Sequence, residues 1–176
     1  MKQERKIRRS TMDDLGRMLE IYEFARKQMC LNGNPNQWVN YPSRELLEED
    51  IKSGVSYVIE SDSEVIGTFV FCIGEDPTYQ VIEEGGWLND EPYGTIHRIA
   101  SDGTQEGLFK LVEKYCSQQI DNIRIDTHED NKIMQHILEK SGFSKCGIIY
   151  TYDGSPRIAY QKKYKRISEA TVDCAV

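Results

Sequence analysis

Three side chains that can take part in proton transfer lie on two segments with the alternating pattern of β-strands. His97 lies in the segment Thr95–Ser101, and Asp126 and His128 lie in the segment Ile123–His128. A histidine side chain can accept and release a proton near neutral pH. If the two strands are neighbours, these residues indicate general acid–base chemistry. His97 is then the candidate base, and Asp126 is the next candidate.

Each of these residues also has an interpretation that involves no catalysis. His97 is as readily a core histidine that is hydrogen-bonded to a neighbour. For Asp126 we prefer a structural ion pair with Arg98 across the sheet, and we expect His128 to face solvent where its strand ends. A metal site built from His97, Asp126 and His128 is a remote alternative, because no other ligands gather in the chain. We therefore expect no metal.

The elements that position these residues follow from the periodicity of apolar residues. Regular alternation in Thr95–Ser101 places His97 and Ile99 on one face of a strand, and Arg98 and Ala100 on the other. The turn Ser101–Leu108 then opens a helix. A glycine-containing turn of this kind can bind a phosphate, because main-chain N–H groups and the helix dipole converge there. Most such turns bind nothing, so the turn alone is weak evidence.

The stretch Arg124–Phe143 carries the clearest signals. It begins as a strand, and Asp130 and Asn131 then offer side-chain oxygens to the start of a helix. The apolar residues of this helix recur at helical spacing, namely Ile133, Met134, Ile137 and Leu138. Gly142 ends the helix in a left-handed conformation, and a second apolar run, Cys146–Tyr152, follows.

This order of strand, Asp-Asn, short helix, Gly-Phe and strand resembles the C-terminal half of the GNAT N-acetyltransferase superfamily, which binds acetyl-CoA. The usual family pattern is Asn, two residues, Ala, then Tyr-Glu-Lys and Gly-Phe. The matching residues here are Asn131, Met134, Glu139, Lys140, Gly142 and Phe143. The main departure is Leu138, which stands where many members have a tyrosine that protonates the CoA thiolate. The general acid is therefore open, and we assign it to none of the other tyrosines.

The resemblance also gives the glycine turn a role, because in the family the main-chain amides of this turn hold the CoA pyrophosphate. Of the family pattern, the segment 104–109 keeps only Gly107. The resemblance implies cofactor contacts from Ile99, Ala100, Gln105, Glu106, Gly107, Leu108, Phe109, Asn131 and Met134. Glu106 would place a negative charge beside the phosphates, and Phe109 would prevent the closest approach that glycine allows.

The resemblance extends over the chain in element order: strand, helix, helix, hairpin, strand, helix, strand, helix, hairpin. It implies an α/β (α+β) fold with a mixed, mostly antiparallel central sheet, flanking helices and splayed central strands. We expect a single acetyltransferase-like domain over residues 1–176, in which the tail 166–176 is not placed. In this family the acceptor pocket forms near the first two helices, which implies walls from Trp38 and Tyr93. A lid over the core is an equal alternative for Trp38.

Composition limits the partners. The net charge is −7 and no long basic run occurs, so we expect no nucleic acid. No apolar run approaches a membrane span and none resembles a signal peptide, so we expect no membrane and a cytoplasmic protein. The five cysteines are odd in number and widely spaced, which indicates neither a disulfide framework nor a zinc site. A homodimer remains open.

These expectations combine into one function and one alternative. The resemblance implies direct transfer of an acetyl group from acetyl-CoA to a primary amine of a small-molecule or peptide acceptor. The acidic segment Glu75–Tyr93 would suit a cationic acceptor, although we prefer to interpret its charges as a solvated face. The alternative is a catalytically degenerate domain that binds or senses CoA, for which the poor glycine turn and Leu138 argue. A dinucleotide-binding domain is disfavoured because no GxGxxG follows the first strand.

Overall fold

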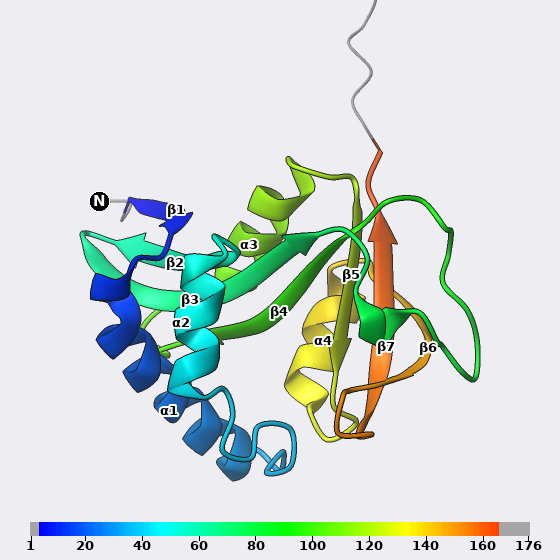
Figure 1. The fold of residues 1–176 in the computed structure, drawn as a ribbon, viewed down its shortest axis with the longest axis horizontal. Coiled ribbons are helices and arrows are strands. Elements are labelled where there is room, and N and C mark those ends of the chain that lie inside the picture. Colours follow the sequence, from blue (N-terminus) through cyan, green and yellow to red (C-terminus); the bar gives the residue numbers. More distant parts are fainter. Residues whose placement is uncertain (1–3, 166–176) are drawn as a thin grey trace, which may run out of the picture.

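A seven-stranded sheet with the order β1-β2-β3-β4-β5-β7-β6 runs through the molecule (Figure 1). The computed structural model describes residues 4–165, so the tail 166–176 that the sequence did not place lies outside the described residues. The strands are β1 (Arg5–Arg9), β2 (Ser56–Ser61), β3 (Glu64–Ile73), β4 (Gly94–Ser101), β5 (Asn122–Thr127), β6 (Ser144–Tyr150) and β7 (Pro156–Lys163). Only β4 and β5 pair in parallel, which confirms the expected mixed, mostly antiparallel sheet.

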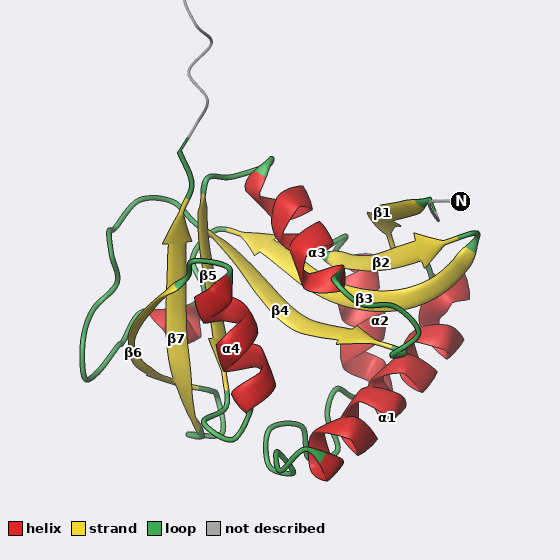
Figure 2. Ribbon diagram, turned by 180° about the vertical axis from the view of Figure 1, so that it is seen from behind, coloured by secondary structure: helices red, strands yellow, loops and turns green. Residues whose placement is uncertain are grey.

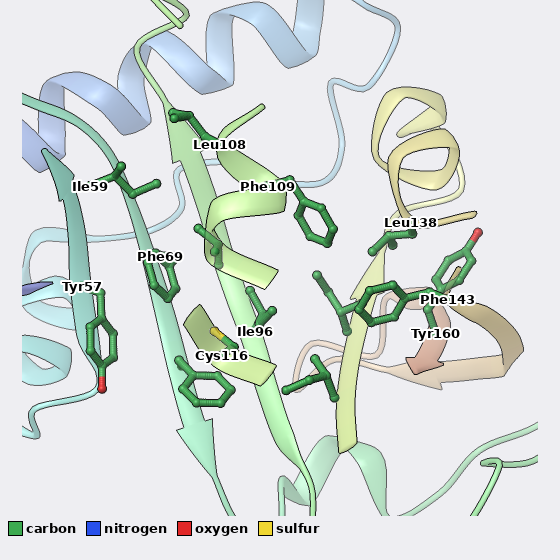
Figure 3. Packing of buried hydrophobic residues seen from close by; sticks show 14 of the residues in the cluster. Tyr57, Ile59, Phe69, Ile96, Leu108, Phe109, Cys116, Leu138, Phe143 and Tyr160 are labelled. Atoms are coloured by element: carbon green, nitrogen blue, oxygen red, sulfur yellow. The ribbon is translucent and has the colours of Figure 1, made fainter. Parts of the chain in front are cut away.

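Helices cover both faces of the sheet. One face is covered by α1 (Leu15–Leu31) and α2 (Arg44–Lys52), and the other by α3 (Leu108–Ser117) and α4 (Lys132–Lys140), as Figures 1 and 2 show from opposite sides. The main hydrophobic core lies between the sheet and the second pair of helices. Figure 3 shows part of this core, in which Leu138 lies near Phe143 and Tyr160. A smaller core joins α1 and α2 to β2 and β4.

The strands β4 and β5 pair only at their beginnings, through Gly94 with Ile123 and Thr95 with Arg124. Beyond these residues they separate, as predicted for the central strands, and a gap opens between them (Figure 2).

A β-bulge in β4 overturns the regular alternation predicted for this strand. Two residues of β4, Arg98 and Ile99, stand opposite the single residue Phe69 of β3, and Arg98 has a φ of 50°. The hydroxyl of Tyr22 in α1 donates to the carbonyl oxygen of Arg98 over 2.8 Å. As a result, His97 and Arg98 both contact groups on the α1–α2 side of the sheet, whereas Ile99 packs against the main core on the other side. His97 and Ile99 therefore do not share a face. The extra residue of the bulge is the physical reason.

The long connection between β3 and β4 folds back over the α1–α2 side of β5, β6 and β7. It contains the short 3-10 helix η2 (Pro77–Tyr79) and a β-bridge from Glu83 to Ile148 of β6. The contact is close, because a Cβ atom on Gly85 would lie 2.0 Å from the carbonyl oxygen of Cys146. Only glycine fits there, so this loop is held by its backbone against the sheet.

Candidate functional site

A cavity of about 970 Å³ opens between the C-terminal half of α1, the end of β4, the start of α3 and α4. Eight of the residues expected to contact a cofactor line it, namely Ile99, Ala100, Gln105, Gly107, Leu108, Phe109, Asn131 and Met134. Glu106, the ninth residue of this predicted set, does not line the cavity. Segments from α1, the β4–α3 turn and α4 thus meet around one space.

The glycine turn presents the start of α3 to this cavity. Gly107 is the N-cap residue of α3 and has a φ of 75°, a left-handed conformation that glycine adopts without strain. The first N–H groups of a helix have no acceptor within the helix. Because Gly107 and Leu108 line the cavity, this end of α3 is available to an anion there.

The two expected obstacles at the turn are turned away from it. Glu106 is exposed and outside the cavity lining, and its carbonyl oxygen accepts from the Arg5 guanidinium (3.0 Å). The ring of Phe109 is buried and packs edge-on against Phe143 with centroids 6.1 Å apart. Neither side chain therefore covers the start of α3.

The charge around the cavity is positive although the chain as a whole is acidic. The charged residues in its lining are Lys110, Lys132, Lys140, Lys162, Glu113 and Asp130. Lys162 donates to Glu113 over 2.6 Å, which leaves three lysines and one aspartate as the remaining charges. These lysines, together with the start of α3, suit a ligand with several phosphates.

Asn131 connects the cavity with the loop between α1 and α2. Its side-chain oxygen accepts from the backbone N–H of Met134 (3.0 Å), so it caps α4 as predicted. Its amide nitrogen donates to the side-chain oxygen of Gln37 (2.8 Å).

His97 lies on the other side of the gap between β4 and β5, where it forms a pair with Asp76. Its Nε2 atom is 2.8 Å from Oδ2 of Asp76, and the two side chains are 25% and 18% exposed. Burial acts to raise the pKa of Asp76, but hydrogen bonds from His97 and Thr78 outweigh it and bring the pKa to about 2. Asp76 is thus an ionised partner for His97 at neutral pH.

The contact of Asp76 with His97 was not predicted, because in the sequence Asp76 is one of several charges on an acidic loop. The local signal was the order Asp76-Pro77-Thr78, in which the aspartate carboxylate accepts from the backbone N–H of Thr78 (2.9 Å) and starts η2. The hydroxyl of Tyr93 also accepts from the backbone N–H of Asp76 (2.8 Å). Nothing local indicated that the carboxylate meets His97.

Asp126 does not pair with Arg98, so that prediction was wrong. Asp126 instead accepts from the hydroxyl of Tyr79 over 2.6 Å. Arg98 donates to Asp50 of α2 (2.5 Å) and to the hydroxyl of Tyr41 (2.7 Å). The bulge causes the difference, because it directs Arg98 toward α2 rather than across the gap to β5.

His128 is also placed differently from the prediction. It is 8% exposed rather than facing solvent, and its Nδ1 atom accepts from the backbone N–H of Asp130 (3.1 Å). Within residues 4–165, no group of three or more histidines, cysteines and acidic residues could hold a metal ion.

Comparison with solved structures decides the family. A GNAT-family acetyltransferase from Streptococcus agalactiae is 31% identical, covers 92% of this chain and 96% of its own, and has a TM-score of 0.83. The chain belongs to the GNAT family. A GNAT acetyltransferase from Listeria monocytogenes has the same fold at 18% identity, with 90% and 94% of the two chains covered and a TM-score of 0.67.

The chain is also similar, more distantly, to an enzyme that was solved in complex with two ligands. The N-acetylglutamate synthase of Neisseria gonorrhoeae, solved with coenzyme A and N-acetyl-glutamate, is 13% identical with a TM-score of 0.57, and the match covers 94% of this chain and 36% of the synthase. No protein-family model and no curated protein sequence matches the chain.

This GNAT protein departs from the family pattern at Leu138, which is fully buried in the main core. The tyrosines near the site are engaged elsewhere: Tyr150 donates to Glu83 and Tyr160 to Glu139. Burial and the neighbouring Asp126 raise the pKa of Tyr79 well above its usual value. The chain therefore provides no hydroxyl at the position of the family tyrosine.

The two residues expected to form acceptor walls both support other parts of the site. Trp38 packs edge-on against Tyr22 with centroids 5.6 Å apart, so it covers the smaller core beside the bulge. The ring of Tyr93 stacks on the guanidinium of Arg124 (3.9 Å), and its hydroxyl accepts from the backbone N–H of Asp76.

Among residues 4–165, none of the helices is long and apolar enough to cross a membrane.

Proposed function

We propose that this protein transfers an acetyl group from acetyl-CoA directly to a primary amine, with His97 as the base. One observation carries the proposal: the lysine-lined cavity and the His97–Asp76 pair lie on opposite sides of the gap between β4 and β5. Beyond Thr95 and Arg124 the two strands have no further register pairs with each other.

The residues of the cavity fit acetyl-CoA. The start of α3 and the lysines suit its phosphates, and the amides near Ile99 and Ala100 lie at the edge of β4 that faces the gap. When bound, acetyl-CoA supplies an acetyl group already activated as a thioester. The chain's own part is to hold this molecule, to position the amine and to remove a proton from it.

The hydrogen bond between His97 and Asp76 determines which atom of the histidine can act as the base. An ionised carboxylate can only accept, so the Nε2 atom of His97 carries the hydrogen that points to Asp76. The Nδ1 atom of the neutral ring is then the proton acceptor. Asp76 stabilises the imidazolium that forms when the ammonium of the acceptor gives up its proton.

Direct transfer is supported by the state of the cysteines. Burial raises the pKa of Cys72, Cys116 and Cys146, so these thiols are protonated at neutral pH and are poor nucleophiles. An acetylated cysteine as an intermediate is therefore disfavoured at these positions.

Two measurements test the proposal. Acetyl-CoA at about a hundredfold over its dissociation constant should add roughly 2.7 kcal/mol of stability, which raises the melting temperature by roughly 5–10 °C for a domain of this size. CoA release, followed with a thiol reagent across a panel of amines, should then show turnover. The absence of any melting shift with millimolar acetyl-CoA would contradict the proposal.

The alternative function is a domain that binds CoA without turnover. It is favoured by Leu138, because this fully buried side chain offers no proton to a departing thiolate. A melting shift with acetyl-CoA but no CoA release with any amine would support this alternative. Direct protonation of the thiolate by water is consistent with turnover, since a thiol is acidic enough to leave without a positioned acid.

A further inference from the structure

Three neighbouring strands carry a row of charged side chains on the α1–α2 side of the sheet. His97 comes from β4 and Asp126 from β5, and Tyr79 contacts both: its ring is 6.0 Å from the His97 ring and its hydroxyl donates to Asp126. Asp126 lies directly opposite Ala159 of β7. Arg157 lies two residues before Ala159 and therefore on the same face.

Asp126 has no cationic partner. The one hydrogen bond to its carboxylate comes from the neutral hydroxyl of Tyr79, and no cationic side chain of residues 4–165 lies within ion-pair distance. It is partly exposed. A carboxylate in this position attracts a cation that the described part of the chain does not provide.

Arg157 forms no direct ion pair within residues 4–165. Its charge acts on Asp153, whose pKa is lowered by hydrogen bonds from Thr151 and Ser155 and by the charge of Arg157. Its guanidinium donates to the hydroxyl of Ser155 (2.5 Å), the carbonyl of Pro156 (2.9 Å) and the carbonyl of Gln37 (3.3 Å), all of which are neutral. The residue is only 8% exposed, and within residues 4–165 no carboxylate lies within ion-pair distance. A guanidinium has five N–H donors, and the three bonds leave some of them for an anion. A largely buried cation of this kind is stabilised by a counter-ion.

The other charges of this face are matched or covered. Arg98 pairs with Asp50, and His97 pairs with Asp76. The guanidinium of Arg124 lies between the rings of Trp87 and Tyr93, at 4.1 Å and 3.9 Å. Within residues 4–165, Asp126 and Arg157 are thus the charged side chains of this face that have neither a direct ion pair nor an aromatic ring stacked on them.

Asp126 and Arg157 do not form an ion pair with each other. Diagonal neighbours on one face of an antiparallel pair are roughly 7–8 Å apart, which is within reach of an arginine side chain. Yet Arg157 extends toward the loop between α1 and α2 instead of toward Asp126. The residue opposite Asp126 is Ala159, whose small side chain is fully buried and packs in one cluster with Tyr79.

We infer that the acceptor is a small zwitterion, namely a free amino acid. This inference rests on the proposed acetyl transfer. The ammonium of the amino acid lies between Asp126 and His97, where Asp126 holds the charge and His97 takes the proton. The carboxylate lies against Arg157.

The inference makes a sharp distinction among amines. Polyamines, aminoglycosides, lysine side chains and the N-termini of peptides all have an amine but lack a carboxylate next to it. Each would leave the Arg157 guanidinium without a counter-ion. The acidic charges of the β3–β4 loop are then not the determinant of the acceptor, apart from Asp76.

The test compares three forms of the same acceptor with the wild-type protein and acetyl-CoA. They are a panel of free amino acids, the matched amino acid amides and the matched amines without the carboxyl group. CoA release should be faster with the free amino acids by about ten- to a hundredfold in kcat/KM, the scale expected when a charged hydrogen-bond partner is lost. Equal values for the free acids and the amides would overturn the inference while leaving the proposed acetyl transfer in place.

Two variants assign the preference to its residue. Arg157→Gln should lower kcat/KM for the free amino acid to the value for its amide. Arg157→Lys should keep part of the preference for the free amino acid over the amide. Arg44→Gln removes an equal charge from an exposed position on α2 and should keep the full preference. Each variant is first shown to be folded by an unchanged melting shift with acetyl-CoA. A folded Arg157→Gln protein that keeps the preference would contradict the role of Arg157.

A binding experiment decides the inference if no acceptor gives turnover. The same three panels are then titrated against the protein in the presence of CoA, with the melting temperature as the readout. Stabilisation by free amino acids, absent with amides and lost in Arg157→Gln, would support the zwitterion site although the proposed catalysis had failed. Equal or absent stabilisation across the panels would overturn it.

Discussion

The two sides of the gap between β4 and β5 are built in different ways. The cofactor side, defined by the lysine-lined cavity, is formed by the start of α3, the edge of β4 and a short helix with its cap. The acceptor side, defined by His97, Asp76, Asp126 and Arg157, is formed by side chains that meet across long stretches of sequence. Asp76 and His97 are 21 residues apart, Tyr79 and Asp126 are 47 apart, and Gln37 and Arg157 are 120 apart.

This difference determines how each side responds to substitution. A site made of main-chain groups should tolerate changes of side chain, because the groups that bind are present whatever the residue. A site made of paired side chains depends on each partner. Substitutions on the acceptor side should therefore change the rate strongly, and substitutions on the cofactor side should change it only where they alter the backbone or the core.

The largest effect is expected from His97→Gln on the acceptor side. Glutamine keeps a hydrogen-bonding group of similar size but cannot titrate, so the maximal rate should fall about a hundredfold or more. The measurement is CoA release at saturating amine. The melting shift with acetyl-CoA should stay the same, because the cavity does not include His97. An unchanged rate in the folded variant would make His97 a structural residue and Asp126 the next candidate.

A smaller effect, on stability, is expected when the family tyrosine is restored on the cofactor side. Leu138 is fully buried beside Phe143 and Tyr160, so Leu138→Tyr overpacks the core and should lower the free energy of unfolding by about 1–3 kcal/mol. Urea denaturation measures this change, and Leu138→Met is the volume-conserving control, with an expected cost below about 1.5 kcal/mol. A stable Leu138→Tyr protein with a higher rate would show that the position still serves as an acid site.

The backbone of the glycine turn can be tested with a matched pair of glycines. Gly107 and Gly154 have φ values of 75° and 80°, and a Cβ atom on either would meet no atom within 4 Å. Valine at either position is strained by the left-handed conformation, by about 1–3 kcal/mol. Titration with CoA should show roughly tenfold weaker binding for Gly107→Val, and unchanged binding for Gly154→Val. Equal CoA affinities in the two variants would place the phosphates away from the turn.

The smallest effect is expected for Glu106→Lys. The sequence alone predicts stronger CoA binding, because a negative charge beside the phosphates is removed. Since the Glu106 side chain is exposed and outside the cavity lining, we expect less than about a twofold change, and only at low salt. Lys110→Glu, which places a negative charge in the lining, should weaken binding more. The reverse order would show that the phosphates lie on the outer side of the turn.

The fold and the residues that line the cavity could be predicted because their signals are local. Asn131 caps its helix through the next turn of the same helix, and Gly107 needs only its own left-handed conformation. The acceptor side could not be predicted in this way. The bulge adds one residue at Arg98 without interrupting the alternating pattern of the sequence. It places His97 and Ile99 on different faces of the sheet and directs Arg98 toward α2.

The errors at His128 and Asp76 have the same physical origin. His128 is buried directly after the last residue of β5 although its local sequence is polar. Asp76 meets His97 because the β3–β4 loop is anchored on β6 at Gly85. Contacts between distant segments leave no periodic trace in the sequence.

The position of β7 between β5 and β6 has a consequence for how the chain acquires its structure during synthesis. The strands β1 to β4 pair with one another in the order in which they occur in the chain. This half of the sheet can therefore form once residues up to Ser101 have emerged. β5 has only two register pairs with β4, and β6 pairs along its length only with β7. Until Pro156–Lys163 has been made, both strands keep an unpaired edge, which is the kind of surface that promotes association between chains.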